Sequence, residues 1–310
     1  MHKIAFSFLV FIFLMNDNLK SQISFSEFGY VQLDAVDGAV LYSKEVTRGK
    51  NKYTVYCQVL DLKTIKLANF IDKSDKIKEG EGKYLAQKEL SKSPYFTTYS
   101  FENALKQAQK SSKSPIIGMI HGVFFEEFNA ATQLAFPIKN NGKILSAGSS
   151  PQGPCDNPKL PIFKDIQLKA LVWTDSTIAI KNYDTQTGTP LTDTHFPNGF
   201  VTYQYTEHPA KLKRPLDADR FLVMGTFGTD SLKADNQLII VSVNQAGIEF
   251  AAAHLRQFGV KSDIITIGGR ATTLLYNKNK KVLQPLGFSV IADVVTNMQL
   301  PHFLFFTKKD

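Results

Sequence analysis

Ile264-Ile265-Thr266-Ile267-Gly268-Gly269-Arg270-Ala271-Thr272 is a short apolar strand that runs directly into a glycine turn. A second stretch of the same kind lies well before it in the chain: Ile116-Ile117-Gly118-Met119-Ile120-His121-Gly122-Val123-Phe124-Phe125. Continuous apolar runs of this length are typical of buried strands, and a glycine at a strand end allows positive φ or a close approach of backbone N–H groups to a ligand. We therefore expect two core strands whose glycine turns line one pocket.

Each glycine strand is preceded by a segment with helical spacing. In the first, Phe101, Ala104, Leu105 and Ala108 follow Ser100, a residue that can cap a helix N-terminus. The second, residues 246–258, carries one apolar stripe and ends at Gly259, where a helix C-cap is expected. We predict helices over 101–109 and 246–258.

The rest of the chain alternates apolar and polar residues as strands do. Residues 23–67 begin this pattern, and hairpins are expected over 135–145, around the turn Asn140-Asn141-Gly142-Lys143, and over 168–181. Further strands are expected at 200–205, 221–226 and 238–243. The predicted fold class is α+β, with mixed or antiparallel curved sheets flanked by a few helices.

The N-terminus has the layout of a secretory signal. An apolar run from Ile4 to Met15 follows Lys3 and gives way to polar residues that end near Ser21. It is shorter than the ~20 apolar residues of a spanning helix. We predict a signal peptide over 1–21, a mature domain over 22–310 without a membrane span, and export to the periplasm or the medium. A single N-terminal membrane anchor is the alternative.

Two segments interrupt the mature domain. The charged stretch 72–92 is predicted to be a surface excursion, and the proline-rich loop 151–161 is where a seam between subdomains is expected.

Composition narrows the class of protein and of partner. Apolar content of 43% and aromatic content of 12% favour a globular, β-rich chain over disorder. The net charge of +8 favours anionic partners such as phosphate-bearing glycans, while scattered lysines without a basic helix argue against nucleic acid.

The chain has two cysteines, Cys57 and Cys155. Cys57 shares its alternation with Val55 and Val59, which predicts a buried thiol, and a disulfide with Cys155 is the alternative in an oxidising compartment. No spacing of cysteine and histidine is typical of a zinc site. The sequence thus predicts no cofactor and leaves open a divalent cation held by oxygen ligands.

The two glycine segments resemble the Ile-Asn-Gly-Gly-Phe-Phe and Asp-Gly-Gly-Gly-Ser-Thr motifs of the phosphodiester glycosidase family. The likeness spans residues 54–291, including a helix before each motif and a Gly-Lys hairpin after the first. The matching residues are Gly122, Phe124, Phe125, Gly268, Gly269 and Thr272. The resemblance implies an α+β domain that hydrolyses a sugar phosphodiester.

Five motif positions depart from the family pattern. His121 replaces Asn and Val123 replaces Gly in the first motif. In the second motif Ile267 stands where the family has Asp, and Arg270 and Ala271 replace Gly and Ser. Glycoside hydrolysis ordinarily uses two carboxyl groups, so the loss of the Asp bears directly on activity.

The resemblance suggests a rebuilt site. A phosphate leaving group needs less acid catalysis, and His121 and Arg270 could stabilise it as cations. We predict His121, Glu126 and Arg270 as catalytic residues, and Gly122, Gly268, Gly269 and Thr272 as substrate-binding residues. Glu127, Asp230 and Asp235 are further candidate carboxylates. Each predicted residue also has an ordinary structural role open to it: the acids could be solvated loop or turn residues, and His121 could be a buried core residue. Arg270 could be an ion-pair partner of Asp263.

Three functions follow from these patterns. The first is an exported phosphodiester-glycosidase-like hydrolase that acts on a sugar phosphodiester or a related surface glycan. The second is a catalytically inactive relative that binds carbohydrate or a cell-surface partner. The third is a structural domain whose glycine turns serve packing alone.

Overall fold

The computed structural model describes residues 24–75, 94–125, 130–148, 166–207, 221–227, 235–243, 247–260, 262–267, 275–278, 282–284 and 299–310. The predicted signal peptide 1–21 and the proline-rich loop 151–161 lie outside these residues, as does most of the charged stretch 72–92.

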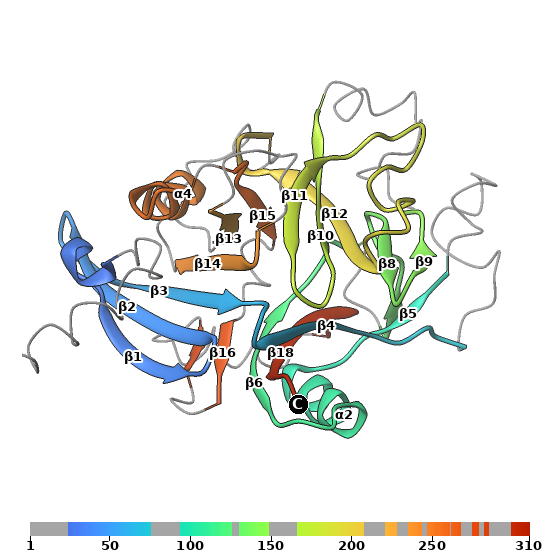
Figure 1. The fold of residues 1–310 in the computed structure, drawn as a ribbon, viewed down its shortest axis with the longest axis horizontal. Coiled ribbons are helices and arrows are strands. Elements are labelled where there is room, and N and C mark those ends of the chain that lie inside the picture. The colour runs from blue at the N-terminus through green and yellow to red at the C-terminus, as the bar shows by residue number, and fades with distance from the viewer. Residues whose placement is uncertain are drawn as a thin grey trace, which may run out of the picture.

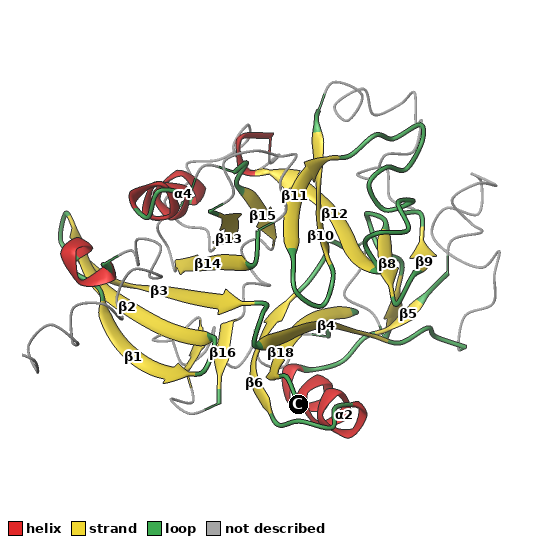
Figure 2. Cartoon of the chain, viewed as in Figure 1, coloured by secondary structure: helices red, strands yellow, loops and turns green. Residues whose placement is uncertain are grey.

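The described chain forms two large antiparallel sheets and two α-helices (Figures 1 and 2). The larger sheet has 11 strands, in the order β1-β2-β3-β14-β13-β15-β12-β10-β11, with β8 paired to β12 and β9 to β8. The smaller sheet has the order β17-β16-β6-β18-β4. Every strand pairing among the described residues is antiparallel, so the prediction of an α+β fold holds with antiparallel rather than mixed sheets.

Most strands of the larger sheet lie where the alternation in the sequence predicts them, whereas the strands at 282–284 and 302–308 of the smaller sheet were not predicted. In the larger sheet the strands are β1 (Val31–Val36), β2 (Ala39–Arg48), β3 (Asn51–Asp61), β8 (Ile138–Asn140), β9 (Lys143–Ser146), β10 (Leu168–Trp173), β11 (Ile178–Asn182), β12 (Asn198–Gln204), β13 (Phe221–Thr226), β14 (Gln237–Val243) and β15 (Ile265–Ile267). In the smaller sheet they are β4 (Ile65–Ile71), β6 (Ile116–His121), β16 (Leu275–Asn277), β17 (Val282–Gln284) and β18 (His302–Lys308). A two-stranded sheet pairs β5 (Phe96–Thr97) with β7 (Ala131–Thr132).

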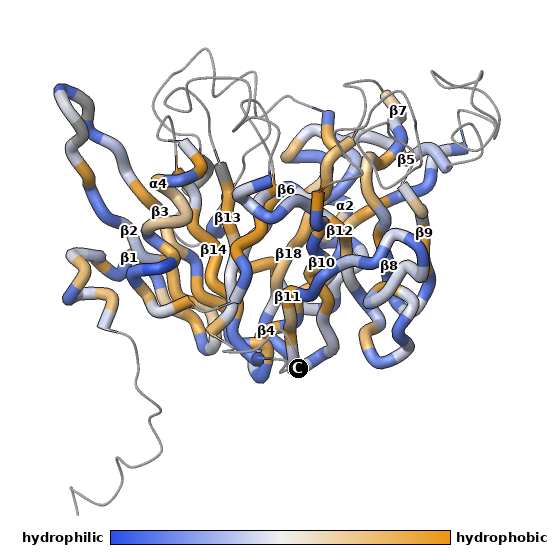
Figure 3. The backbone as a smooth tube through the Cα atoms, turned by 90° about the horizontal axis from the view of Figure 1, so that it is seen from above, coloured by the Kyte–Doolittle hydropathy of each residue, from blue (hydrophilic) through white to orange (hydrophobic). Residues whose placement is uncertain are grey.

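The central core lies between the two large sheets. Because side chains of a strand point alternately to its two faces, Leu222 and Met224 of β13 enter this central core while Val223 packs on the opposite face. The smaller sheet contributes Leu304 and Phe306 of β18 to the same core. Apolar residues are accordingly concentrated in the central strands (Figure 3).

The two helices cover the outer faces of the sheets. Helix α4 (Ile248–Gln257) packs Ala251, Ala252 and Leu255 with Val223 of the larger sheet, and helix α2 (Phe101–Ser111) packs Phe101 with Phe303 of the smaller sheet. Both predicted helices are therefore confirmed, and the described molecule is layered as helix, sheet, sheet and helix (Figure 1).

Local signals of the sequence account for the ends of these elements. The Ser100 side chain accepts a hydrogen bond from the Asn103 backbone N–H at the start of α2. Asn141 and Gly142 have φ of 48° and 79° in the β8–β9 turn, which confirms that predicted hairpin.

Cys57 is fully buried among Val55, Val241 and Leu255, under α4. Burial raises the pKa of its thiol well above the ordinary value. The predicted buried thiol is confirmed, while Cys155 lies outside the described residues.

The position of Gly118 on β6 is set by packing. A Cβ atom there would lie 2.1 Å from the Phe306 ring and 2.7 Å from the Tyr276 carbonyl oxygen. We expect Gly118→Ala to lower the free energy of unfolding by about 1–3 kcal/mol through overpacking. The measurement is urea denaturation of Gly118→Ala, Phe306→Leu and the double variant. The smaller Leu side chain should recover part of the loss, and strictly additive effects would contradict this steric account.

Candidate functional site

The two glycine motifs start from different sheets but from one core. Ile120 of β6 and Val123 lie in the central cluster together with Ile265 and Ile267 of β15. The first motif leaves the smaller sheet at Gly122, and the second leaves the larger sheet after Ile267. The structure therefore brings the strands of both motifs to opposite sides of the same apolar layer.

Gly122 is required by a close contact with His302 of β18. A Cβ atom at Gly122 would lie 1.9 Å from the His302 Nδ1 atom, so only glycine fits without a shift of the ring. The Gly122 N–H donates to the His302 carbonyl at 2.9 Å, and the Val123 N–H donates to His302 Nδ1 at 3.0 Å. The two backbone donors at this turn are thus used inside the protein.

His302 belongs to a buried polar chain that sequence reasoning missed. Because Nδ1 accepts from Val123, the neutral ring carries its proton on Nε2, which lies 3.0 Å from Asn69 Oδ1 on β4. The Asn69 amide in turn donates to the Lys139 carbonyl at 3.2 Å and to Asn140 Oδ1 at 3.3 Å. This chain ties β18 and β4 of the smaller sheet to the β8–β9 hairpin of the larger one.

His121 lies on the opposite face of β6 from Gly122. It pairs across the ladder with Phe303, whose side chain belongs to the cluster under α2. The His121 side chain is 3% exposed, and burial lowers its pKa to about 3. It is therefore a neutral imidazole at physiological pH, which matches the core-histidine alternative and leaves no positive charge for phosphate.

Ile267, which the resemblance of the sequence aligns with an Asp, is completely buried. Its side chain joins Leu222 and Met224 in the central core, where a lone carboxylate would be strongly disfavoured. The neighbouring Thr266 hydroxyl donates to the Leu222 carbonyl, and the Thr202 hydroxyl donates to the Thr266 carbonyl at 2.6 Å. The end of β15 is thus part of the hydrophobic core.

Some of the remaining predicted site residues lie in the described part of the chain, and others lie outside it. Phe124 stacks edge-on against Phe136 and Tyr203, and Phe125 packs on the core, as expected for core aromatics. Asp235 accepts from the backbone N–H groups of Asn236 and Gln237, as a turn residue does. The residues outside the described part are Glu126, Glu127, Asp230, Gly268, Gly269, Arg270 and Thr272.

Asp263, the suggested partner of Arg270, contacts another cation. Its Oδ2 lies 2.6 Å from Nζ of Lys169, a largely buried lysine of β10. No spacing in the sequence points to this pair, because the two residues are far apart in the chain.

The described ranges contain no cluster of three or more His, Cys, Asp or Glu side chains able to hold a metal ion. No helix among them is long and apolar enough to cross a bilayer.

The buried histidines predict acid sensitivity. Desolvation lowers the pKa of His302 to about 3, with His121 contributing, and that of His254 to about 4, against an ordinary 6.5. The unfolded chain then binds protons that the folded chain excludes. We expect the free energy of unfolding to fall as pH drops below 6.5, by about 1.4 kcal/mol per pH unit for each histidine.

Urea denaturation at several pH values between 4 and 7 measures this slope. His302→Gln should have a shallower slope than the unmodified chain, while His195→Gln, at an exposed position, should keep it. An unchanged slope in His302→Gln would contradict the assignment.

Ile267 provides a second test. Ile267→Asp places a carboxyl in the core and is expected to lower the free energy of unfolding by about 3–5 kcal/mol, whereas Ile267→Val loses about 1 kcal/mol. Because burial favours the neutral acid, the Asp variant should lose more stability as pH rises through 4–7. Equal stability of the two variants at pH 7 would show that this position opens to solvent.

Comparisons with known proteins bear on the fold. No family model matches the sequence, and no curated protein matches it. Among solved structures, a hypothetical protein from Synechocystis matches with a TM-score of 0.49 and 11% identity over 90% of this chain. The match spans only 64% of the Synechocystis chain.

The second similar structure is the catalytic domain of zebrafish N-acetylglucosamine-1-phosphodiester alpha-N-acetylglucosaminidase, auto-inhibited by its pro-peptide. It matches with a TM-score of 0.51 and 11% identity, over 87% of this chain and 83% of that chain. The fold of this protein is therefore similar to that of a phosphodiester glycosidase catalytic domain.

Proposed function

We propose that this chain is an exported protein of the phosphodiester-glycosidase type that binds a sugar phosphodiester or a related surface glycan. Three observations support the proposal: the fold similarity to the zebrafish catalytic domain, the likeness of the two glycine motifs, and their placement on one core. Residues 1–21 support export as a signal peptide. No cofactor is proposed.

Binding without hydrolysis is the version that the geometry supports best. The observation that carries it is the complete burial of Ile267 at the family Asp position. An aliphatic side chain in the core neither donates a proton nor attacks an anomeric carbon. The neutral, buried His121 also lacks the charge that would stabilise a phosphate leaving group.

Hydrolysis through a rebuilt site is the second version. Glu126 and Arg270 follow Val123 and Ile267 by three residues each, and those two apolar residues share the central core. Arg270 would hold phosphate oxygens through its planar fork, and Glu126 would act as acid or base. Gly268, Gly269 and Thr272 would shape the pocket in either version, whereas the space at Gly122 is taken by His302.

The test combines turnover and binding for the mature chain. A chromogenic sugar phosphodiester is incubated with and without Mg²⁺, and binding of a non-hydrolysable analogue is followed by calorimetry. We expect saturable binding and no turnover above that in buffer. Arg270→Ala should weaken binding at least tenfold, and Lys66→Ala, an exposed control on β4, should not.

The other outcomes separate the remaining versions. Turnover that is abolished in both Glu126→Gln and Arg270→Ala, with folding intact by circular dichroism, would replace binding by hydrolysis. Absence of both turnover and binding would favour a structural domain whose glycine turns serve packing, as Gly122 serves the contact with His302.

A further inference from the structure

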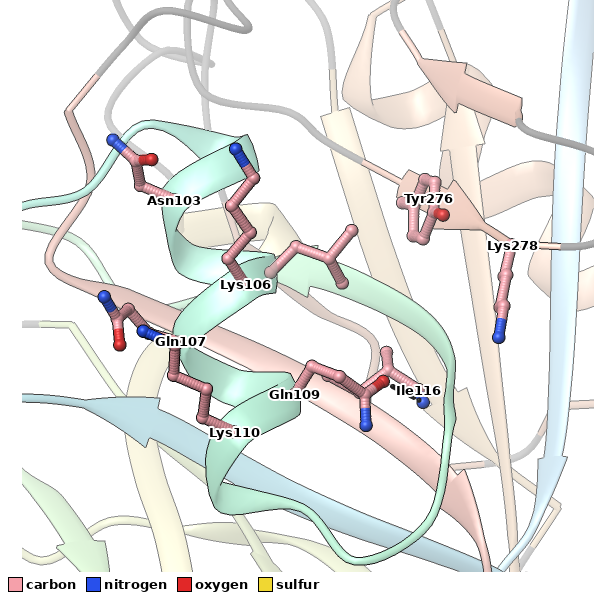
Figure 4. A pocket seen from close by; sticks show the side chains of 9 residues that line it. Asn103, Lys106, Gln107, Gln109, Lys110, Ile116, Tyr276 and Lys278 are labelled. Carbon is pink, nitrogen blue, oxygen red and sulfur yellow. Dashed lines mark hydrogen bonds between the residues drawn. The ribbon is translucent and has the colours of Figure 1, made fainter.

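A pocket of 470 Å³ lies between helix α2 and strand β16, on the outer side of the smaller sheet (Figure 4). Its walls include Leu105, Lys106 and Gln109 of α2 and, across the gap, Tyr276 and Lys278 (Figure 4). The volume is within the range of sites for small organic ligands, about 300–1,000 Å³.

The walls of this α2–β16 pocket are held by named contacts. The Gln109 side chain accepts from the Ile116 N–H at 3.0 Å and donates to the Ser114 carbonyl at 3.3 Å, which fixes the end of α2 against β6. The Tyr276 ring packs against Phe101 with centroids 5.2 Å apart. The pocket is thus formed by side chains with fixed neighbours.

Tyr276 of β16 and Lys278, which directly follows the strand, line the pocket opposite α2. The Tyr276 face of β16 is the one covered by α2. The Lys278 backbone N–H donates to the Ile117 carbonyl at 2.9 Å, which holds the start of this turn against β6. An aromatic ring and a lysine therefore lie across the pocket from the helix.

The pocket is rich in positive charge. Lys106, Lys110 and Lys278 line it, and none of the described residues that line it is acidic. Among the described residues none of these lysines forms an ion pair. Glu102, one turn before Lys106 on α2, is the nearest carboxylate along the helix and does not pair with it. Two lysines one turn apart on a helix repel each other mildly, which a bound anion would relieve.

This pocket is distinct from the glycine turn at Gly122. Ile116, at its floor, begins β6, and Gly122 follows the other end of that strand. Six residues of extended strand separate them, or about 20 Å at the usual rise.

We propose that the α2–β16 pocket is a second binding site, which takes an anionic group of an oligosaccharide. Lys106 and Lys278 contact the phosphate or sulfate oxygens, and the Tyr276 ring packs against a sugar face. The choice of a glycan rests on the proposed function; the anionic group follows from the lysines.

The experiment measures binding of a fluorescein-labelled, sulfated heparin hexasaccharide to the mature chain by anisotropy. Lys106→Glu/Lys278→Glu is compared with Lys66→Glu/Lys113→Glu, a pair of exposed lysines outside the pocket with the same change in net charge. We expect the dissociation constant to rise at least tenfold in the pocket variant and less than threefold in the control. Tyr276→Leu should weaken binding severalfold.

Hydrogen exchange supplies an independent readout on the unmodified chain. The hexasaccharide should protect amides of 101–111 and 275–278, and uncharged maltohexaose should not. Competition by inorganic phosphate alone at millimolar concentration would identify the anion as the recognised group.

Equal weakening in both double variants would show non-specific charge attraction and overturn the site. An unchanged dissociation constant in the pocket variant would also overturn it. The Arg270→Ala test of the glycine turns uses a different ligand and different residues. Loss of either site is therefore distinguishable from loss of the other.

Discussion

The apolar layer between the two sheets is the constraint on which the rest of the structure depends. It takes one face of nearly every long strand, from Leu41 and Leu60 near the N-terminus to Leu304 and Phe306 near the C-terminus. Because burial of this surface is the main favourable term in folding, the strands must keep a register that points these side chains inward. The residues on the outer faces of the sheets then decide where the helices, the turns and the buried polar groups lie.

The first glycine motif shows how that constraint acts on a candidate site. Its strand sits in the smaller sheet beside β18, and the His302 ring lies directly on Gly122. The backbone donors that could hold a ligand bind His302 instead. The glycine turn at 122 here supports a buried link between two sheets through His302, Asn69 and the Lys139 carbonyl.

The two proposed sites differ in their physical basis. The glycine turns would bind at the end of the core, where the loss of the family Asp leaves recognition better supported than chemistry. The α2–β16 pocket lies on the far side of the smaller sheet and depends on exposed lysines and one tyrosine. If both proposed sites bind, this basic chain would hold a long anionic glycan at more than one point, which strengthens attachment without tighter single contacts.

The sequence by itself determined most strands of the larger sheet, the two helices and the buried thiol at Cys57, but not the strands at 282–284 and 302–308. The features it determined depend on local periodicity, which is legible in residues such as Val55, Cys57 and Val59 or the Ala251, Ala252 and Leu255 stripe. The tertiary structure alone decided that the two glycine strands belong to different sheets, and that His302 needs the space at Gly122. It also decided that Tyr276 and Lys278 face α2. Those facts depend on contacts between residues far apart in the chain, and a local pattern carries no information about which distant side chain fills the space next to it.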